Sequence, residues 1–326
     1  MRQATRMVDG AEEGREAPDL PPVLAVVGPT ATGKTALAVR LALRMGRAEL
    51  LNADSRQVLR SLRVGTNAPT AEQLGGVPCH LLGITDPGAG FSAADWLRAA
   101  LGCLADLDRR GVRPIVVGGT GLYVRALLDG LDLDGGAPDP ARRAALNARA
   151  AGPQGLAGMA EELRRRDPEG AAGIDLRNPR RVVRALEIVE ARGTLSARRR
   201  EGATRPSVRI GLDVAADRHR RWVTERAQAM FRAGLVEETR AALRDGVTAE
   251  VLDGCGIGYR EALDVLAGRA SEAAAAAAIV RRTLRYAKTQ RTWFRADRDT
   301  VWLYREGDDD LDEVATAALA AAGGHP

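Results

Sequence analysis

Membrane spans, paired cysteines and clusters of metal ligands are all missing from this 326-residue sequence. No apolar run reaches the roughly 18 residues that a membrane-spanning helix needs, so we expect no membrane association. The first 20 residues mix charges without an apolar stretch, which predicts a disordered tail rather than a signal peptide. The cysteines and histidines do not have the spacing of a disulfide framework or of a metal site; they are Cys79, Cys103, Cys255, His80, His219 and His325. These absences predict a cytoplasmic protein with reduced thiols.

Lysine is also scarce, although the chain is basic with a formal net charge of +5. Only Lys34 and Lys288 are present, and the other 46 of the 48 basic residues are arginine. Ammonium and guanidinium groups are not interchangeable at phosphate sites. The two retained lysines therefore point to positions where an ammonium group is needed.

Lys34 belongs to the stretch GPTATGKT, residues 28–35, which follows the apolar run VLAVV. A GxxxxGK[ST] turn between a strand and a helix cradles phosphate groups with its backbone N–H groups, and its last hydroxyl can bind Mg²⁺. A purely structural turn would not explain why Lys34 and Thr35 follow directly. The residues expected to bind phosphate are Gly28, Pro29, Thr30, Ala31, Thr32, Gly33, Lys34 and Thr35.

Strand and helix signals alternate along the first 130 residues, which predicts an α/β fold with a parallel, doubly wound sheet. We expect strands at 23–27, up to Asp54 and at the start of 113–129, and helices at 34–46 and after the capping residues Ser92 and Asp95. The loops beyond the carboxyl ends of such strands converge on one crevice. The phosphate loop, Asp54 and the GGTG turn should therefore face one ligand.

The composition changes near residue 134, and residues 138–204 have the pattern of short helices separated by Gly and Pro. Beyond them we expect a strand at 209–214, one long helix at 218–245 and another at 271–294. These patterns predict an α/β core with a helical insertion. The aromatic residues expected to fill the core are Trp96, Trp293 and Phe294.

Two short motifs allow both a structural and a chemical interpretation. Asp54 or Ser55 in NADSRQV can cap a helix, or Asp54 can accept a proton from a nucleophile that attacks beside the phosphates. The glycines of GGTGLY, residues 118–123, can form a simple turn, or Thr120 can contact substrate. The residues alone leave both choices open.

Arginine is concentrated in the insertion, with ten arginines against three acids between residues 177 and 209. Asn178 and Pro179 form a helix start. Arg180, Arg181 and Arg184 then share one helical face, opposite an apolar face. A solvated face is the ordinary interpretation, but charge of nearly one sign favours a polyanion such as nucleic acid.

Eight motifs in one order resemble those of bacterial tRNA dimethylallyltransferases, the isopentenyl transferases of tRNA. They are GPTATGKT, NADSRQV…GTNAPT, VPCHLLGITDP, FSAADW, VVGGTGLYVRALLDGL, RNPRRVVRALEI, GIGYREAL and YAKTQRTWFR. The resemblance implies a P-loop kinase-like α/β core, residues 21–137 and 205–322. It also implies that the insertion, residues 138–204, grips the anticodon stem-loop of tRNA.

The implied activity is transfer of a dimethylallyl group from dimethylallyl diphosphate to the exocyclic amine of the adenosine 3′ of the anticodon, in tRNAs that read codons beginning with U. By this resemblance the loop binds the departing diphosphate with Mg²⁺ at Thr35, and Asp54, Lys34 and Thr120 are catalytic. Matches to tRNA-contacting positions are Asp54, Ser55, Arg56, Gln57, Thr120, Arg143, Arg180, Arg181, Arg184, Gly256, Ile257, Gly258, Tyr259, Arg260, Lys288, Gln290 and Trp293. No obligate protein partner is implied.

Two positions depart from the resemblance, because Trp222 and Thr289 stand where similar sequences have arginine. Arg220, Arg221 or Arg291 are candidates to supply the missing charge. The alternatives are a small-molecule P-loop kinase that uses ATP, a prenyltransferase acting on free adenine nucleotides, and a non-catalytic RNA-binding module.

Overall fold

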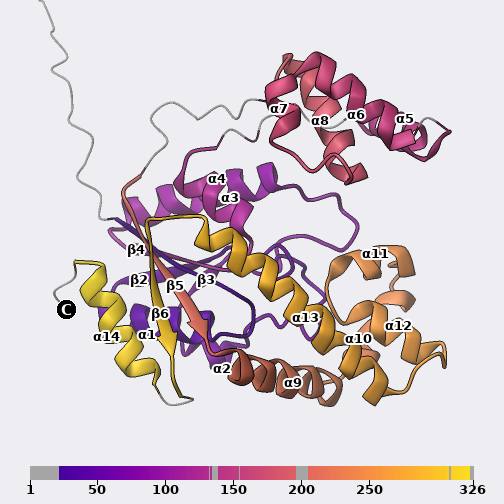
Figure 1. Cartoon of the computed structure of the whole chain (residues 1–326). Coiled ribbons are helices and arrows are strands. Elements are labelled where there is room, and N and C mark those ends of the chain that lie inside the picture. Colours follow the sequence, from indigo (N-terminus) through magenta and orange to yellow (C-terminus); the bar gives the residue numbers. More distant parts are fainter. Residues whose placement is uncertain are drawn as a thin grey trace, which may run out of the picture.

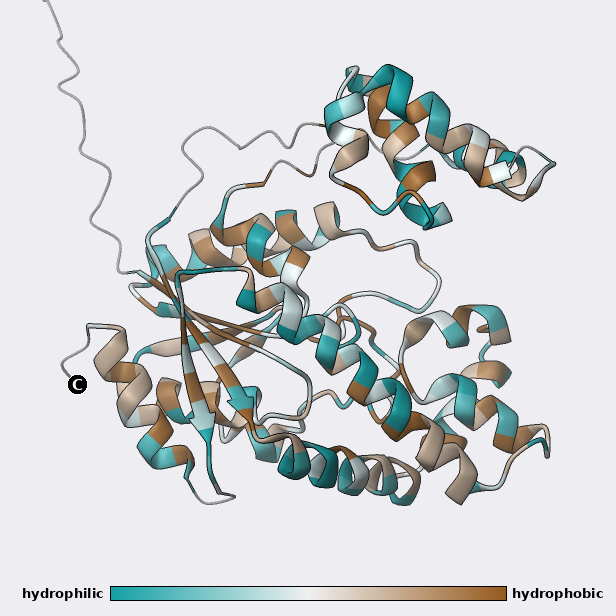
Figure 2. Cartoon of the chain, viewed as in Figure 1, coloured by the Kyte–Doolittle hydropathy of each residue, from teal (hydrophilic) through white to brown (hydrophobic). Residues whose placement is uncertain are grey.

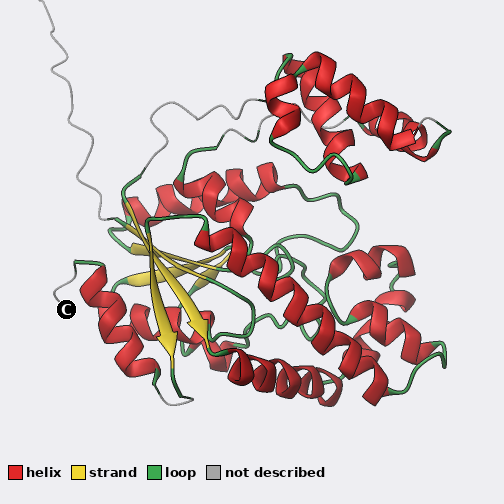
Figure 3. Cartoon of the chain, in the orientation of Figure 1, coloured by secondary structure: helices red, strands yellow, loops and turns green. Residues whose placement is uncertain are grey.

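A six-stranded parallel sheet forms the centre of the computed structural model (Figure 3). The structure describes residues 22–131, 133, 139–153, 155–195, 205–307 and 310–323, so the expected tail at 1–20 and His325 lie outside it. The strand order is β3-β2-β4-β1-β5-β6, which confirms the predicted α/β fold. The strands are β1 (Val23–Val27), β2 (Ala48–Asn52), β3 (Cys79–His80), β4 (Arg113–Val117), β5 (Ser207–Val214) and β6 (Thr300–Arg305).

In the first half of the described chain, helices alternate with strands along the sequence, whereas the second half is mostly helical (Figure 1). They are α1 (Lys34–Met45), α2 (Ala71–Leu74), α3 (Ala93–Arg109), α4 (Gly121–Leu128), α5 (Pro140–Ala151), α6 (Gly155–Arg166), α7 (Pro168–Ala172), α8 (Pro179–Arg192), α9 (Ala216–Arg232), α10 (Leu235–Arg244), α11 (Ala249–Cys255), α12 (Tyr259–Leu266), α13 (Glu272–Arg295) and α14 (Leu311–Ala321). Among these residues no helix is both long and apolar enough to cross a membrane. The three cysteines form no disulfide, as predicted.

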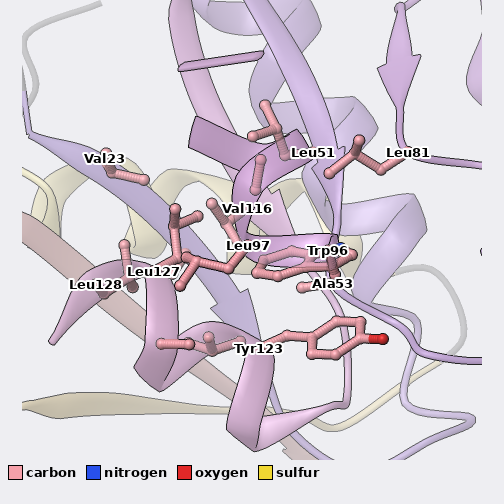
Figure 4. Packing of buried hydrophobic residues seen from close by; sticks show 14 of the residues in the cluster. Val23, Leu51, Ala53, Leu81, Trp96, Leu97, Val116, Tyr123, Leu127 and Leu128 are labelled. Carbon is pink, nitrogen blue, oxygen red and sulfur yellow. The ribbon is translucent and has the colours of Figure 1, made fainter. Parts of the chain in front are cut away.

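Helices cover both faces of the sheet. Alternate residues of β1 point to opposite faces, so that Val23 packs with α3 and α4 whereas Leu24 packs with α1 and α14. Hydrophobic positions accordingly run along the strands, while α9 carries many hydrophilic ones (Figure 2). On the α3 side, the rings of Trp96 and Tyr123 stack with their centroids 4.3 Å apart (Figure 4). The Trp96 indole also donates a hydrogen bond to the Asn52 carbonyl oxygen over 3.0 Å, which ties α3 to the end of β2.

Helices α5–α8 pack around a hydrophobic core of their own, apart from the sheet (Figure 1). The Asn178 side chain accepts hydrogen bonds at the start of α8, and Pro179 is its first residue, as predicted. Val182, Leu186 and Val189 are buried on the opposite side from the exposed Arg180. The described part of the insertion is therefore helical, as the sequence indicated.

A second group of helices, α9–α13, lies between β5 and β6 and has a separate core. The sequence predicted one helix over 218–245, and this prediction is wrong. Gly234 adopts a left-handed conformation with φ of 90° and separates α9 from α10. Such a backbone angle ends a helix, and glycine adopts it without steric cost.

Two further expectations are corrected. Strand β2 ends at Asn52 and a turn follows, so neither Asp54 nor Ser55 caps a helix. The Asp54 carboxylate instead accepts the Arg56 backbone N–H over 2.9 Å. Trp293 does not fill the core, because it remains 42% exposed, whereas Trp96 and Phe294 are buried.

Candidate active site

The phosphate loop connects β1 to α1 and bends at two glycines. Gly28 and Gly33 have φ values of 131° and 90°, and the helix begins at Lys34. A Cβ atom on Gly28 would lie 2.4 Å from the Leu212 carbonyl oxygen. Only glycine lets the loop pass β5 this closely. The bend directs the N-terminal end of α1 toward the cavity, where its unpaired N–H groups favour an anion.

That cavity has a volume of about 460 Å³ and brings together residues that are distant in the sequence. Lys34, Thr35 and other loop residues form one wall, and Asp54 lies on another. A carboxylate and a phosphate-binding ammonium group thus face one space. This juxtaposition is what the sequence led us to expect from converging strand ends.

Lys34 is held back against its own loop. Its Nζ atom donates a hydrogen bond to the Pro29 carbonyl oxygen over 2.6 Å. Burial lowers the pKa of Lys34 to about 8, with the nearby Asp54 carboxylate opposing this effect and Arg226 adding to it. An anion bound beside Lys34 would stabilise the charged form again.

A second, smaller cavity of about 150 Å³ adjoins the first. Thr30, Asp54, Thr66 and Arg226 line both cavities and therefore mark their junction. Much of the second cavity is apolar, with a wall made by Val223, Ala227, Met230, Ile257 and Ile279. The arrangement places Asp54 between an anion-binding space and an apolar space.

Sequence reasoning missed two polar residues on α9 that reach the loop. Arg226 donates a hydrogen bond to the Thr30 hydroxyl over 2.9 Å, and burial lowers its pKa. His219, only 3% exposed, has its Nε2 atom 2.9 Å from the Thr30 carbonyl oxygen, and burial lowers its pKa as well. A signal was present in the sequence, because both residues recur at helical spacing among the buried positions Val223 and Ala227.

In the GGTG turn the glycines are required and the threonine is well placed. A Cβ atom on Gly118 would lie 2.2 Å from the Ala53 carbonyl oxygen. The Thr120 hydroxyl accepts the Ser55 backbone N–H over 2.9 Å and donates to the Ser55 hydroxyl over 3.2 Å. The turn therefore supports the segment that carries Asp54.

Three arginines of the insertion line a groove of about 870 Å³ between the insertion and the core. The groove is lined by Arg180 and Arg184 of α8, by Arg143 of α5, and by the beginning of α3. Arg143 and Arg184 both bind the Glu187 carboxylate. Arg181 is exposed but does not line the groove.

The other residues expected to contact tRNA divide into exposed and buried groups. Lys288 and Trp293 are exposed on α13, and the Arg125 guanidinium lies 5.8 Å from the Trp293 ring centre. Tyr259 is fully buried and Gln290 is 4% exposed, so neither side chain presents a surface to a large ligand.

The remaining members of this set lie near the small cavity or form local contacts. Arg56, Gly256 and Ile257 line that cavity. The Arg260 guanidinium pairs with Asp253, with Nε 2.7 Å from a carboxylate oxygen. Gln57 donates to the Asn67 carbonyl oxygen over 3.0 Å and lines the larger cavity. Gly258 adopts φ of 125° ahead of α12.

Comparison with known proteins identifies the family. The model for "IPP transferase" matches residues 57–297, and a model for "isopentenyl transferase" matches residues 21–82. The chain is a member of the IPP transferase family.

Similar IPP transferases match over nearly their whole length. The chain is 45% identical over 292 residues to tRNA dimethylallyltransferase 1 of Pelobacter propionicus, covering 88% of this chain and 93% of the relative. It is 42% identical over 302 residues to the tRNA dimethylallyltransferase of Thermobifida fusca, covering 90% and 92%.

Solved structures support the same fold. The tRNA isopentenylpyrophosphate transferase from Bacillus halodurans superposes with a TM-score of 0.67 at 34% identity, over 93% of this chain and 97% of that one. A eukaryotic dimethylallyltransferase acting on tRNA superposes with a TM-score of 0.76 at 22% identity, over 92% and 78%, which shows a shared fold.

In this IPP transferase Arg291 is not placed beside the phosphate loop, where it was a candidate to supply the charge missing at Trp222. Both Arg291 donors lie 2.7 Å from the two carboxylate oxygens of Asp213, and the residue does not line the cavity with the phosphate loop. Arg220 and Arg221 are exposed on α9. Instead, the Arg305 guanidinium lies 4.5 Å from the Trp222 ring centre, beside Gly33.

The donor set of this IPP transferase fits a divalent metal held mainly by substrate. Among the described residues no cluster of three or more His, Cys, Asp or Glu side chains could hold a metal ion. Thr35 and Asp54 both line the cavity of the phosphate loop. Mg²⁺ is commonly bound by one or two protein oxygens together with phosphate oxygens and water.

Proposed function

We propose that the chain transfers the dimethylallyl group of dimethylallyl diphosphate to tRNA. The acceptor is the exocyclic amine of the adenosine 3′ of the anticodon, in tRNAs that read codons beginning with U. The observation that carries the proposal is the single cavity lined by Lys34, Thr35 and Asp54. The names of the similar proteins add to it, since they are called tRNA dimethylallyltransferases.

In this proposal the leaving group occupies the cavity of about 460 Å³ that the phosphate loop lines. The loop amides, the Lys34 ammonium group and Arg226 would bind the diphosphate and stabilise the negative charge that develops as the C1–O bond breaks. Bound Mg²⁺, with Thr35 as its ligand, would supply further charge neutralisation. The apolar wall of the smaller cavity would hold the dimethylallyl group or the target base, with C1 at the junction.

Asp54 is the general base in this proposal. An adenine amine is a weak nucleophile because its lone pair is delocalised into the ring. As its nitrogen forms a bond to C1, one N–H proton must leave, and the Asp54 carboxylate would accept it. Ser55 and Thr120 would hold the segment that carries Asp54 in place, because their hydroxyl groups are hydrogen-bonded to each other.

The target base must leave the anticodon loop to reach this junction. We propose that the helical insertion, residues 138–204, binds the anticodon stem-loop so that the base can enter the core, residues 21–137 and 205–322. The groove with Arg180 and Arg184 on one side and α3 on the other supports this role. We also propose that the reaction takes place in the cytoplasm.

The test is incubation with labelled dimethylallyl diphosphate, Mg²⁺ and an unmodified tRNA that reads a codon beginning with U. We expect label in the tRNA and none when the adenosine after the anticodon is replaced by guanosine. Absence of label from the natural tRNA would contradict the proposal, and phosphate transfer from ATP to a metabolite would support the kinase alternative.

The role of Asp54 has its own matched pair of variants. Asp54→Asn should lower turnover by about 10²- to 10⁴-fold, the usual contribution of a general base, while tRNA binding is kept. The exposed Asp245 offers the control Asp245→Asn, which should keep normal turnover. If Asp54→Asn turns over as fast as the control, Asp54 is not the base.

A further inference from the structure

Three side chains from two helices hold Thr30 of the phosphate loop. The Gln290 side-chain oxygen accepts the Thr30 backbone N–H over 2.8 Å. Arg226 donates to the Thr30 hydroxyl, and His219 lies at the Thr30 carbonyl oxygen. Each polar atom of Thr30 therefore has a partner outside the loop, so the position of this residue depends on α9 and α13.

Gln290 also reaches a second loop. Its Nε2 atom donates a hydrogen bond to the Gly119 carbonyl oxygen over 2.9 Å. A Cβ atom on Gly119 would lie 2.3 Å from this nitrogen, so glycine permits the approach. Reversing the amide would place its nitrogen at the Thr30 N–H and its oxygen at the Gly119 carbonyl, which removes both bonds. The orientation is thus set by the two loops.

From Gly119 the hydrogen bonds continue to the segment that carries Asp54. The next residue, Thr120, donates its backbone N–H to the Ala53 carbonyl oxygen over 3.1 Å and is bonded to Ser55 through its hydroxyl. Gln290 is therefore a side-chain link between the phosphate loop and the segment that carries Asp54, in addition to the backbone pairing of the strands.

We propose that Gln290 is a positioning residue that sets the distance between the diphosphate and Asp54. The proposal rests on the proposed function, because it concerns the geometry of that same reaction. The attacking nitrogen, C1 and the leaving oxygen must align, and a displacement of about 1 Å can cost 10²-fold in rate. A buried amide with both ends bonded fixes this alignment more firmly than two independent loops would.

The burial of Gln290 separates this role from contact with RNA. Gln290 is 4% exposed, whereas Lys288 and Trp293 on the same helix are exposed. A large ligand that touches α13 would meet those exposed side chains and not Gln290. Loss of Gln290 should therefore slow chemistry and leave tRNA affinity intact.

Three variants test the proposal in single-turnover transfer of labelled prenyl group to saturating tRNA. Gln290→Met removes both bonds, and Gln290→Glu can still accept from Thr30 but cannot donate to Gly119. The control is Gln228→Met, at an exposed glutamine of α9. Circular dichroism establishes a temperature at which all variants are folded, and filter binding measures the tRNA dissociation constant.

We expect Gln290→Met and Gln290→Glu to slow transfer by about 10- to 100-fold, with tRNA dissociation constants within about twofold of wild type, and Gln228→Met to be normal. Wild-type speed in Gln290→Glu would overturn the bridging role, since one bond would then suffice. Weaker tRNA binding at an unchanged rate would also overturn it and make Gln290 an RNA contact. A wild-type protein without transfer activity would instead refute the proposed function.

Discussion

A single carboxylate, that of Glu238 on α10, holds the loop at residues 63–67 beside both cavities. One of its oxygens accepts the backbone N–H groups of Arg63 and Val64 over 2.7 and 2.8 Å. The other accepts the Gly65 N–H over 3.0 Å and the Tyr259 hydroxyl over 2.8 Å. The Tyr259 ring packs so closely that a Cβ atom on Gly65 would lie 2.3 Å from it. The substitution Glu238→Gln therefore removes hydrogen bonds to this loop while keeping the size of the side chain.

The magnitude follows from counting acceptors. A glutamine side chain offers one acceptor oxygen in place of two, so two of the four donors lose their acceptor and face an N–H group. A buried donor left without a partner costs about 1–3 kcal/mol. Arg63 is exposed, and the Tyr259 hydroxyl can accept from the new amide N–H, so about one buried donor is stranded in either orientation of the amide. Glu238→Gln should therefore lower the free energy of unfolding by roughly 1–3 kcal/mol. Because Thr66 in this loop lines both cavities, prenyl transfer should slow as well.

The assay is urea denaturation together with hydrogen exchange of the amides at residues 63–65. The neighbouring Glu237 offers a matched control, since its side chain is 68% exposed and its nearest arginine nitrogen is 3.7 Å away. Glu237→Gln should change stability by less than about 0.5 kcal/mol. Equal stability and equal amide protection in the two variants would refute the reasoning.

Two further predictions concern electrostatics away from the reacting atoms. The Arg110 hydrogen bonds, and to a lesser degree His80, lower the pKa of Glu49 from 4.5 to about 2. A depressed pKa contributes stability above the unfolded value, which is lost as the pH falls from about 4.5 to about 2. Because the Arg110 side chain is 41% exposed and solvent screens the pair, Glu49→Gln should lower the free energy of unfolding by only about 1 kcal/mol at pH 7. Urea titrations should show a smaller difference from wild type at pH 3, and an equal difference at both pH values would contradict this. Arg180→Glu should weaken tRNA binding and reduce the slope of log affinity against log salt concentration by about 1. The control Arg109→Glu, at the far end of α3, should change neither. Identical slopes for the two variants in filter binding would contradict the role of the groove in binding tRNA.

Local patterns in the sequence were sufficient to predict the inner strands of the sheet and several of the helices around it. The alternation of apolar strands with amphipathic helices predicted the parallel sheet, and the capping pair Ser92 and Asp95 forms the expected capping box of α3. Asn178 and Pro179 begin α8 in the same way. These features depend on residues within a few positions of one another, which is why a pattern can reveal them.

The errors arose where a local pattern was ambiguous. The run at 218–245 has helical character throughout, but Gly234 takes a left-handed conformation that lets α10 pack against α9 and α12. Trp293 is a large aromatic residue of the kind that usually fills a core. In α13, however, it is Phe294 that is buried against the sheet, and Trp293 stays exposed. Packing partners decided both cases.

The sequence alone predicted the phosphate loop, the four inner strands of the sheet, and Asp54 as a candidate near the loop, but not the edge strands β3 and β6. Only the tertiary structure brought in the residues that hold these parts in register. Gln290 binds Thr30 across 260 positions of sequence, and Arg226 binds it across 196. No periodicity spans such separations, because a hydrogen bond between distant segments exists only after the sheet and the helices around it have packed.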